Sequence, residues 1–171
     1  MLSELSLPVG LSSRAGEVRL RRAVPDDLPG LMALLSDDPI SAARGDRADD
    51  ADEGAYAAAL RSVLQAPLND LLVVDDAEGA LVGTLQLTVI PGMARRGATR
   101  LLVEAVRVSS SVRSGGIGSA VMRWVMHEAA PATGASLVQL TSDAARVDAH
   151  RFYTRLGFVD SHVGFKYSVP S

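Results

Sequence analysis

Residues 101–130 have the sequence LLVEAVRVSSSVRSGGIGSAVMRWVMHEAA, and the order of residue types in this stretch decides the fold. Its first part, Leu101–Val108, is mostly Leu, Val and Ala, as expected of a strand that is covered on both faces. A serine-rich turn and the glycine-rich run Gly115–Gly118 follow. Beyond them, apolar residues recur at a helical spacing. The stretch therefore predicts a strand, a glycine-rich loop and an amphipathic helix.

The glycine-rich loop would place backbone N–H groups at the start of the predicted helix, where no helical carbonyl can accept from them. These donors and the helix dipole favour an anion, and glycine lets a phosphate approach the backbone closely. Arg113 would add a charge-assisted hydrogen bond. The alternative is a tight connection without a ligand. The spacing matches neither the dinucleotide pattern G-x-G-x-x-G nor the P-loop, because no Gly-Lys-Ser/Thr follows.

The composition bounds the class of protein. At 171 residues the chain has room for one domain with a substantial core. Its 47% apolar and 22% charged residues are typical of a globular protein, and no apolar run approaches the roughly 18 residues of a membrane helix. The absence of cysteine excludes disulfides and a cysteine nucleophile and favours a cytoplasmic location. A net charge of −3 without a basic tract argues against nucleic acid as a partner.

Patterning along the chain predicts a flexible N-terminal arm over residues 1–16 and a single domain over residues 17–171. We expect strands at Glu17–Ala23, Leu71–Val74, Leu81–Ile90, Leu101–Val108 and Ser136–Thr141, and a terminal hairpin or bent strand pair over Phe158–Val169. We expect helices after Pro25, over Ala51–Gln65, after the glycine-rich loop, and around Ala145–Leu156. The order β-α-α-β-β-β-α-β-α-β indicates an α/β fold, with a central mixed β-sheet and helices on both faces.

Two motifs carry a resemblance to a known family. The loop has the pattern R-x-x-G-x-G at Arg113, Gly116 and Gly118. Residues 141–158, TSDAARVDAHRFYTRLGF, contain A-x-x-F-Y-x-x-x-G-F at Ala149, Phe152, Tyr153, Gly157 and Phe158. In this order and at this separation, the motifs resemble those of the GCN5-related N-acetyltransferases (GNAT). The resemblance covers roughly residues 99–168, and its C-terminal part looks most similar to small-amine acetyltransferases of the aminoalkylphosphonate N-acetyltransferase type.

The resemblance implies a GNAT-like sheet and acetyl-coenzyme A (acetyl-CoA) as cosubstrate, without a metal. In this family the loop binds the pyrophosphate and the pantetheine arm pairs with the end of the preceding strand. The expected cofactor-binding residues are Val106, Val108, Arg113, Ser114, Gly115, Gly116, Ile117, Gly118 and Ser119. Asp143 stands where many relatives have an asparagine that contacts coenzyme A. Because an acid would repel an anionic cofactor, we leave Asp143 out of this set.

Tyr153 is the expected proton donor to the leaving thiolate. A phenol has an ordinary pKa near 10 and can supply a proton or hydrogen bond as the sulfur gains charge. A tyrosine at this motif position has that role in the family. The alternative is a core aromatic residue whose hydroxyl bonds a backbone group.

Glu104 is the candidate base, acting directly or through water, as a glutamate on this strand does in some relatives. It is the only ionisable residue within LLVEAV, where a buried charge would be costly. The alternative is a glutamate that faces outward or pairs with a cation. The family also implies that the N–H of Val108 stabilises the developing oxyanion. Without a cysteine, we expect direct attack within a ternary complex.

The three histidines, His127, His150 and His162, lack metal-ligand spacing, so no metal site is expected. The expected function is an acetyl-CoA-dependent N-acetyltransferase (an acyltransferase) acting on the primary amine of a small molecule. The alternative is a non-catalytic acyl-CoA-binding module that serves as a sensor or scaffold. Tyr153 and Glu104 favour the enzyme. Homodimers are common in the family, so a homodimer is among the expected assemblies.

The charge of the acceptor stays open at the level of sequence. Residues Asp37–Glu53 carry seven acids and two arginines, which would guide a cationic amine if they line the acceptor side. The alternative is that this acidic run is a solvated face. Arg95 and Arg96 would instead bind an anionic acceptor if the turn that contains them reaches the acceptor-binding site.

Overall fold

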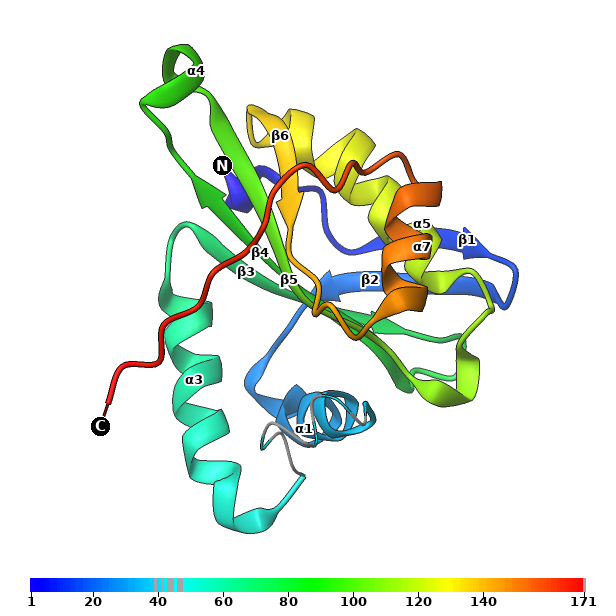
Figure 1. Cartoon of the computed structure of the whole chain (residues 1–171). Coiled ribbons are helices and arrows are strands. Elements are labelled where there is room, and N and C mark those ends of the chain that lie inside the picture. The colour runs from blue at the N-terminus through cyan, green and yellow to red at the C-terminus, as the bar shows by residue number, and fades with distance from the viewer. Residues whose placement is uncertain (39, 41, 43–44, 46–47, 171) are drawn as a thin grey trace.

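A mixed sheet runs through the centre of the molecule in the computed structural model (Figure 1). The structure describes residues 1–38, 40, 42, 45 and 48–170. In this part of the chain the strands are β1 (Val9–Ser13), β2 (Gly16–Arg22), β3 (Asn69–Asp75), β4 (Leu81–Ile90), β5 (Thr99–Val108) and β6 (Ala135–Leu140). They lie in the order β1-β2-β3-β4-β5-β6, and β5 and β6 are the only parallel pair among these described strands.

Helices connect and cover these strands. The α-helices are α1 (Leu28–Ser36), α3 (Glu53–Gln65), α4 (Ala94–Gly97), α5 (Ile117–Trp124), α6 (Ala130–Ala132) and α7 (Val147–Arg155). One π-helical segment, Val125–Ala129, joins α5 to α6. The predicted C-cap of α7 is confirmed: Gly157 has φ +96°, and the N–H of Phe158 donates to the carbonyl of Tyr153 at 3.1 Å.

The sheet is covered on both faces, as the sequence predicts. On one face Leu72, Leu85 and Leu101 pack with Val121 and Met122 of α5 in the larger core. On the other face Val73 packs with Leu31 of α1 and Leu60 of α3. Figure 1 shows α1 and α3 on one side of the sheet and α5 and α7 on the other. The α/β fold class with a central mixed sheet is therefore confirmed.

A half-buried ion-pair network fixes the start of α1 on the sheet. The guanidinium of Arg21 donates to Asp27 at 2.7 and 2.8 Å and to Asp75 at 2.7 and 3.0 Å. The hydrogen bonds from Arg21 hold the pKa of Asp27 below its ordinary value. This anchoring directs the far end of α1, at Asp37 and Asp38, toward the loop after β5.

The N-terminal segment differs from the predicted flexible arm. Residues Val9–Ser13 form β1, which pairs antiparallel with β2 from Val9↔Leu20 to Ser13↔Gly16. Leu2 and Leu5 are buried, and Arg22 donates to the carbonyl of Leu2 at 2.6 Å. The physical reason is the apolar alternation of the segment, which supplies side chains for the surface of α5 while its backbone pairs with β2.

The C-terminal segment also differs from expectation. A hairpin or bent strand pair was expected over Phe158–Val169, but no helix or strand follows α7 through Pro170 in the described chain. Phe158 is half-buried against the core, whereas every residue from Val159 to Pro170 is exposed. The predicted alternation is present in the sequence, yet no strand of the described residues pairs with it.

None of the helices in the described part of the chain has the length and apolar character that crossing a bilayer requires. The predicted polar loop Ile40–Asp50 lies partly outside the described residues. Asp46 and two arginines of the acidic run, Arg44 and Arg47, are among the residues outside it.

Candidate active site

The two halves of β5 have different surroundings. β4 pairs with β5 from Arg100 to Val108, with one interruption, but β6 pairs with it only from Thr99↔Ala135 to Val103↔Leu140. Past Leu140 the chain turns toward α7, so no described strand lies beside Glu104–Val108 on that side. The parallel pair therefore opens at its C-terminal end, which is a general place for a ligand cleft in α/β sheets.

A β-bulge marks the point where the strands separate. Glu104 pairs with Gln86 and Arg107 with Thr84, which leaves Ala105 and Val106 opposite the single residue Leu85. Ala105 has φ +50°, an uncommon conformation for a residue with a side chain. Bulges re-aim side chains and end regular pairing next to active sites. The backbone and side chains of Glu104–Val108 therefore point in directions that differ from the regular alternation of Thr99–Val103.

The glycine-rich loop begins α5 at the open end of β5. Gly116 is the N-cap of α5 and has φ +85°, a conformation that glycine adopts at little cost. In the first turn of α5 the N–H groups of Ile117, Gly118 and Ser119 have no carbonyl partner within the helix. The predicted loop residues thus converge on a helix N-terminus of the kind that binds phosphate.

The β1–β2 turn supports this loop, which the sequence alone did not indicate. The N–H of Ala15 donates to the carbonyl of Gly115 at 2.8 Å, and Arg14 donates to the carbonyl of Ser114 at 2.8 Å. A Cβ added at Gly115 would lie 2.6 Å from the Cβ of Ala15. Gly115 is therefore required by this close approach, whatever the loop binds.

Arg113 connects β5 to α1. Its Nε donates to the carbonyl of Val108 at 3.1 Å, and its Nη2 lies 3.3 Å from the carbonyl and 3.8 Å from the carboxylate of Asp37. These contacts hold the end of the strand next to the end of α1. The predicted contact between Arg113 and a phosphate stays a prediction.

Two consecutive aspartates at the end of α1 brace the site. The carboxylate of Asp37 accepts hydrogen bonds from the N–H of Ser110 at 2.6 Å and its hydroxyl at 2.9 Å, and these bonds lower the pKa of Asp37. Asp38 accepts two hydrogen bonds from Arg146, just before α7, at 2.6 and 2.7 Å. Two acids of the predicted acidic run thus connect α1 to both segments that flank the opening.

Tyr153 lies on α7 among aromatic side chains. Its ring meets Phe152 and Phe158 edge to face, at centroid distances of 5.0 and 5.8 Å. Burial raises the pKa of the Tyr153 hydroxyl above its ordinary value, although the charges of Arg107 and Arg146 oppose this shift. The phenol therefore stays protonated at neutral pH, the form that a proton donor needs. A Cβ at Gly118 would lie 3.5 Å from the ring of Phe152, so α7 packs close to the loop.

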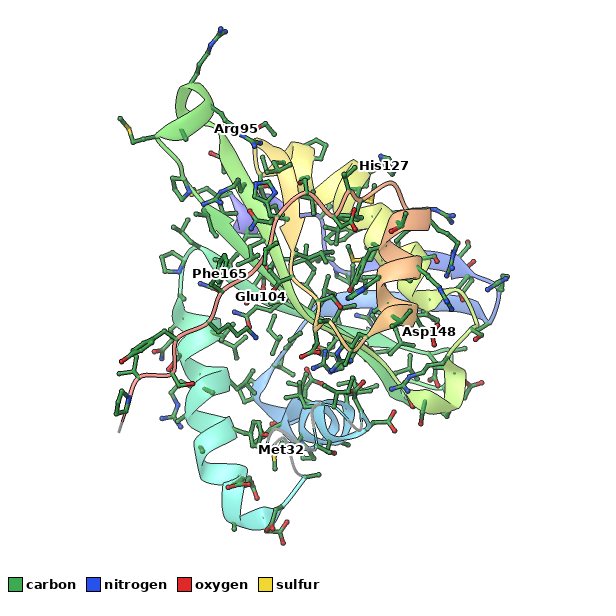
Figure 2. The ribbon with its side chains drawn as sticks, viewed as in Figure 1. Met32, Arg95, Glu104, His127, Asp148 and Phe165 are labelled. Carbon is green, nitrogen blue, oxygen red and sulfur yellow. The ribbon has the colours of Figure 1, made fainter. Side chains whose placement is uncertain are left out.

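Glu104 is exposed on β5, at the start of its open half (Figure 2). Its apolar neighbours in the sequence suggested that Glu104 is buried. In the structure Glu104 instead faces outward, which is the alternative that the sequence left open. The backbone carbonyls of the other two predicted strand residues accept hydrogen bonds from arginines. Arg107 donates to Val106 at 2.9 Å, and Arg113 donates to Val108.

The remaining polar candidates have local roles. The Asp143 carboxylate accepts the N–H of Ala145 at 2.8 Å, and the Nε2 of His150 lies 2.8 Å from the carbonyl of Asp143. His162 lies on the exposed tail beside Ser161, and His127 is exposed on the π-helical segment. Across the described residues, no group of three or more His, Asp or Glu side chains is placed to hold a metal.

Arg95 and Arg96 lie on α4, which precedes β5, whereas the glycine-rich loop follows it. At about 3.3 Å per residue, a ten-residue strand puts them roughly 30 Å from Val108. Figure 2 shows Arg95 on the projection at the far end of the sheet. This geometry does not bring the two arginines to the opening.

A cavity lies elsewhere in the described part of the molecule. It has a volume of about 590 Å³ and lies between the N-terminal segment, β1 and the outer side of α5. Its lining includes Leu5, Val9, Trp124 and His127, and none of the predicted site residues. The opening beside β5 is defined instead by strand pairing, the loop and α7.

Comparison with known proteins identifies the family. The family model described as the acetyltransferase (GNAT) family matches residues 28–158, and the chain belongs to this family. Acetyl-CoA is the cosubstrate of these acetyltransferases. An aminoalkylphosphonate N-acetyltransferase of Salmonella typhimurium is 40% identical over 63 residues, which are 37% of this chain. That match spans about 40% of the curated relative's length.

Solved structures resemble the whole domain. A transcriptional regulator from Bacillus halodurans has a TM-score of 0.83 at 36% identity, covering 89% of this chain and 99% of its own. An Agrobacterium tumefaciens protein described as a putative acetyltransferase has a TM-score of 0.73 at 27% identity, covering 88% and 99%. A glucosamine-6-phosphate N-acetyltransferase from Arabidopsis thaliana, at 15% identity, shares the fold with a TM-score of 0.71, covering 90% and 99%.

Proposed function

We propose that the protein is an N-acetyltransferase that transfers the acetyl group of acetyl-CoA to the primary amine of a small molecule. The observation that carries the proposal is the open half of β5, flanked by the helix-capping glycine loop and by Tyr153 on α7. A cleft for the thioester, donors for phosphate and a protonated phenol thus lie around one opening.

The residues present fit acetyl-CoA. The open edge of Glu104–Val108 offers backbone groups with which an amide-containing arm pairs as a strand would, and Val106 and Val108 supply these groups. The N–H groups of Gly116–Ser119, together with Arg113, Ser114 and Gly115, form the phosphate-binding loop. Arg113 requires only a local side-chain movement to reach a phosphate, since its present partners are carbonyls and one aspartate.

Tyr153 acts as the general acid. Acetyl transfer releases a thiolate, and the buried phenol, whose pKa is raised, donates its proton to that sulfur. The N–H of Val108 stabilises the negative charge that develops on the thioester oxygen. Glu104, exposed at the start of the open half, accepts the proton of the attacking amine through water. The chain has no cysteine, so the amine attacks acetyl-CoA directly in a ternary complex.

The acceptor is a small primary amine. The acidic run is less suited to attracting a cationic amine than its charge suggests, because three of its acids already accept hydrogen bonds within the chain. Asp37 bonds to Ser110, Asp38 to Arg146, and Asp49 to the N–H of Ala51. Arg107, whose charge acts on Tyr153, places positive charge near the opening, whereas Asp38 balances the charge of Arg146. Together with the similarity to an aminoalkylphosphonate N-acetyltransferase, this supports including anionic amines among the acceptors.

An amine panel tests the proposal. The purified chain is incubated with acetyl-CoA and with cationic, neutral and anionic primary amines, and thiol release is followed while products are identified by mass spectrometry. Because the chain has no cysteine, it contributes no thiol to the signal. Amine-dependent thiol release with an acetylated product supports the enzyme.

The alternative is a non-catalytic acyl-CoA-binding sensor, and the similarity to a structure described as a transcriptional regulator favours it. Tight binding of acetyl-CoA without acetylated product for any amine of the panel would support the sensor and contradict the enzyme.

A further inference from the structure

The cavity between the N-terminal segment, β1 and the outer side of α5 takes no part in the proposed reaction. Its volume of about 590 Å³ lies within the roughly 300–1,000 Å³ of small-molecule sites. No residue that is predicted to bind acetyl-CoA or to catalyse its reaction lines this cavity. Figure 1 shows β1 beside α5, and Figure 2 labels His127 on the helical segment that borders the cavity.

The floor of the cavity is apolar. Leu5 and Trp124 line it from the larger core, in which both are buried, and Val9 and Leu11 of β1 are half-buried against the same core. Val9 and Leu11 share one face of β1, because successive side chains of a strand alternate between its two faces. An apolar group placed here would leave water, and an aromatic ring would also meet the indole of Trp124.

The rim of the cavity carries one charge of each sign. Arg123, on α5, and Glu128, on the π-helical segment, both line the cavity and are exposed. Within the described part of the chain, neither side chain makes a hydrogen bond or an ion pair. Glu4, which also lines the cavity, already pairs with the N-terminal ammonium of Met1. The rim therefore offers one cation and one anion to a ligand that carries both charges.

The π-helical segment Val125–Ala129 determines which residues face the cavity. Twelve residues make about 3.3 turns of an α-helix, so a regular helix would turn Ala132 away from the face of Ala120. The π-helical turn adds one residue, and Ala132 and Ala120 line the same cavity. By the same count Arg123 and Glu128 lie about one turn apart. Such π-helical turns occur frequently at functional sites.

We infer that this cavity binds a free α-amino acid with an apolar side chain. The carboxylate of the amino acid pairs with Arg123 and its ammonium pairs with Glu128. Its side chain lies over Val9, Leu11 and Trp124. Opposite charges one turn apart match a molecule whose carboxylate and ammonium share one carbon atom, whereas a ligand with a single charge would use only one of the two. The inference goes beyond the proposed function and does not depend on it.

L-phenylalanine tests the inference, because Trp124 is the only tryptophan of the chain and its fluorescence reports from the cavity. The purified chain is titrated without acetyl-CoA, so that no acetylation occurs, and calorimetry measures the affinity independently of fluorescence. We expect saturable binding with a Kd of about 1 mM or lower, as for ligands of this size. Phenethylamine lacks the carboxylate and hydrocinnamate lacks the ammonium, so each should bind roughly tenfold more weakly. L-leucine, which keeps both charges and an apolar side chain, should also bind.

Substitutions at the rim assign the binding to this cavity. Arg123→Gln and Glu128→Gln should each weaken phenylalanine binding roughly tenfold, and both side chains are exposed, so the variants should fold. Arg61→Gln, at an exposed arginine of α3 on the other face of the sheet, is the matched control and should keep full affinity.

Three results would overturn the inference. The first is the absence of saturable binding of both amino acids, by either method, up to about 10 mM. The second is that phenethylamine or hydrocinnamate binds as tightly as phenylalanine. The third is full affinity for phenylalanine in either rim variant.

Discussion

The first half of β5, Thr99–Val103, lies between β4 and β6, whereas the second half, Glu104–Val108, has a described strand on one side only. Leu101 and Val103 of the first half are buried in the larger core. The second half contains the bulge at Ala105, the exposed Glu104 and the carbonyls to which Arg107 and Arg113 donate. One strand thus has a regular, doubly paired part and an irregular, open part.

This difference shows how the fold separates stability from function. In the first half, apolar side chains are buried and backbone groups pair with both neighbouring strands, so substitutions there change the free energy of unfolding. In the second half, the backbone edge and the adjoining loop remain available to a ligand. We therefore expect substitutions in and around the two halves to have separable effects on stability and on catalysis.

The largest expected effect concerns the first half. Leu101 has no exposed surface, so Leu101→Ala should lower the free energy of unfolding by about 2–5 kcal/mol, from lost burial and the cavity that remains. Urea unfolding measures this loss. Glu104→Ala, at an exposed position of the second half, is the control and should change stability by less than about 0.5 kcal/mol. Equal losses for both variants would contradict the separation of the two halves.

Tyr153→Phe should lower kcat by roughly 100-fold, because it removes the proton but keeps the aromatic packing with Phe152 and Phe158. Affinity for acetyl-CoA, measured by calorimetry, should be unchanged. The pKa of this phenol is raised, so the proton donor is present below that pKa and is lost as pH rises through it. The wild-type kcat should therefore fall only above about pH 10, and the variant should lack this decline. A raised KM with an intact kcat would mark Tyr153 as a binding residue instead.

Gly116→Ala should weaken acetyl-CoA binding roughly tenfold, because a side chain at φ +85° distorts the loop that presents the N–H groups. The same strain should lower stability by about 1–2 kcal/mol. Gly134→Ala is the matched control: its φ is +70°, no atom lies within 4 Å of the added Cβ, and it lies away from the loop. We expect the control to lose similar stability and keep full affinity. If both variants lost affinity alike, strain rather than the loop would explain the effect.

Asp37→Ala should weaken acetyl-CoA binding a few-fold and cost about 1 kcal/mol of stability, since it removes the acceptor of two hydrogen bonds from Ser110. Asp49→Ala removes a comparable cap, to the N–H of Ala51, away from the site. Calorimetric titration of both variants compares them. Affinity lost in Asp49→Ala but kept in Asp37→Ala would contradict a bracing role for the end of α1.

The smallest expected effect is at the bulge. Ala105→Gly relieves the positive φ of +50° and should raise the free energy of unfolding by a few tenths to about 1 kcal/mol, with acetyl-CoA affinity unchanged. Urea unfolding and calorimetry together measure both quantities. A large loss of affinity would show that the side chain of Ala105, rather than the backbone edge, contributes to the site.

Much of the fold followed from local pattern. The range of β4 was predicted as Leu81–Ile90, which are the residues it occupies. Its apolar composition and the turns on either side define where the strand begins and ends. The end of α7 shortly before Gly157 followed from the need for a positive φ just after a helix. The N-terminal strand was missed because β1 is short and polar at one end, so its alternation is weak, and it becomes a strand by pairing with β2.

The site was less accessible to sequence reasoning. Motifs at fixed spacing in the sequence indicated Tyr153 and the Arg113–Ser119 loop, and the roles of these residues stay predictions. The braces from Asp37, Asp38 and the Arg14–Ala15 turn join residues 73 to 108 positions apart in the chain, and no local pattern encodes such contacts. The sequence left open whether Glu104 is buried or faces outward: an apolar strand suggests burial, but the departure of β6 after Leu140 opens that edge.

Amide hydrogen exchange with and without acetyl-CoA tests most directly whether the open half of β5 is the donor site. We predict that acetyl-CoA slows exchange at amides of Glu104–Val108 that do not pair with β4 and at amides of Gly116–Ser119, and leaves Thr99–Val103 unchanged. Protection confined to the cavity between β1 and the outer side of α5, with the loop and the open half of β5 unchanged, would contradict the account.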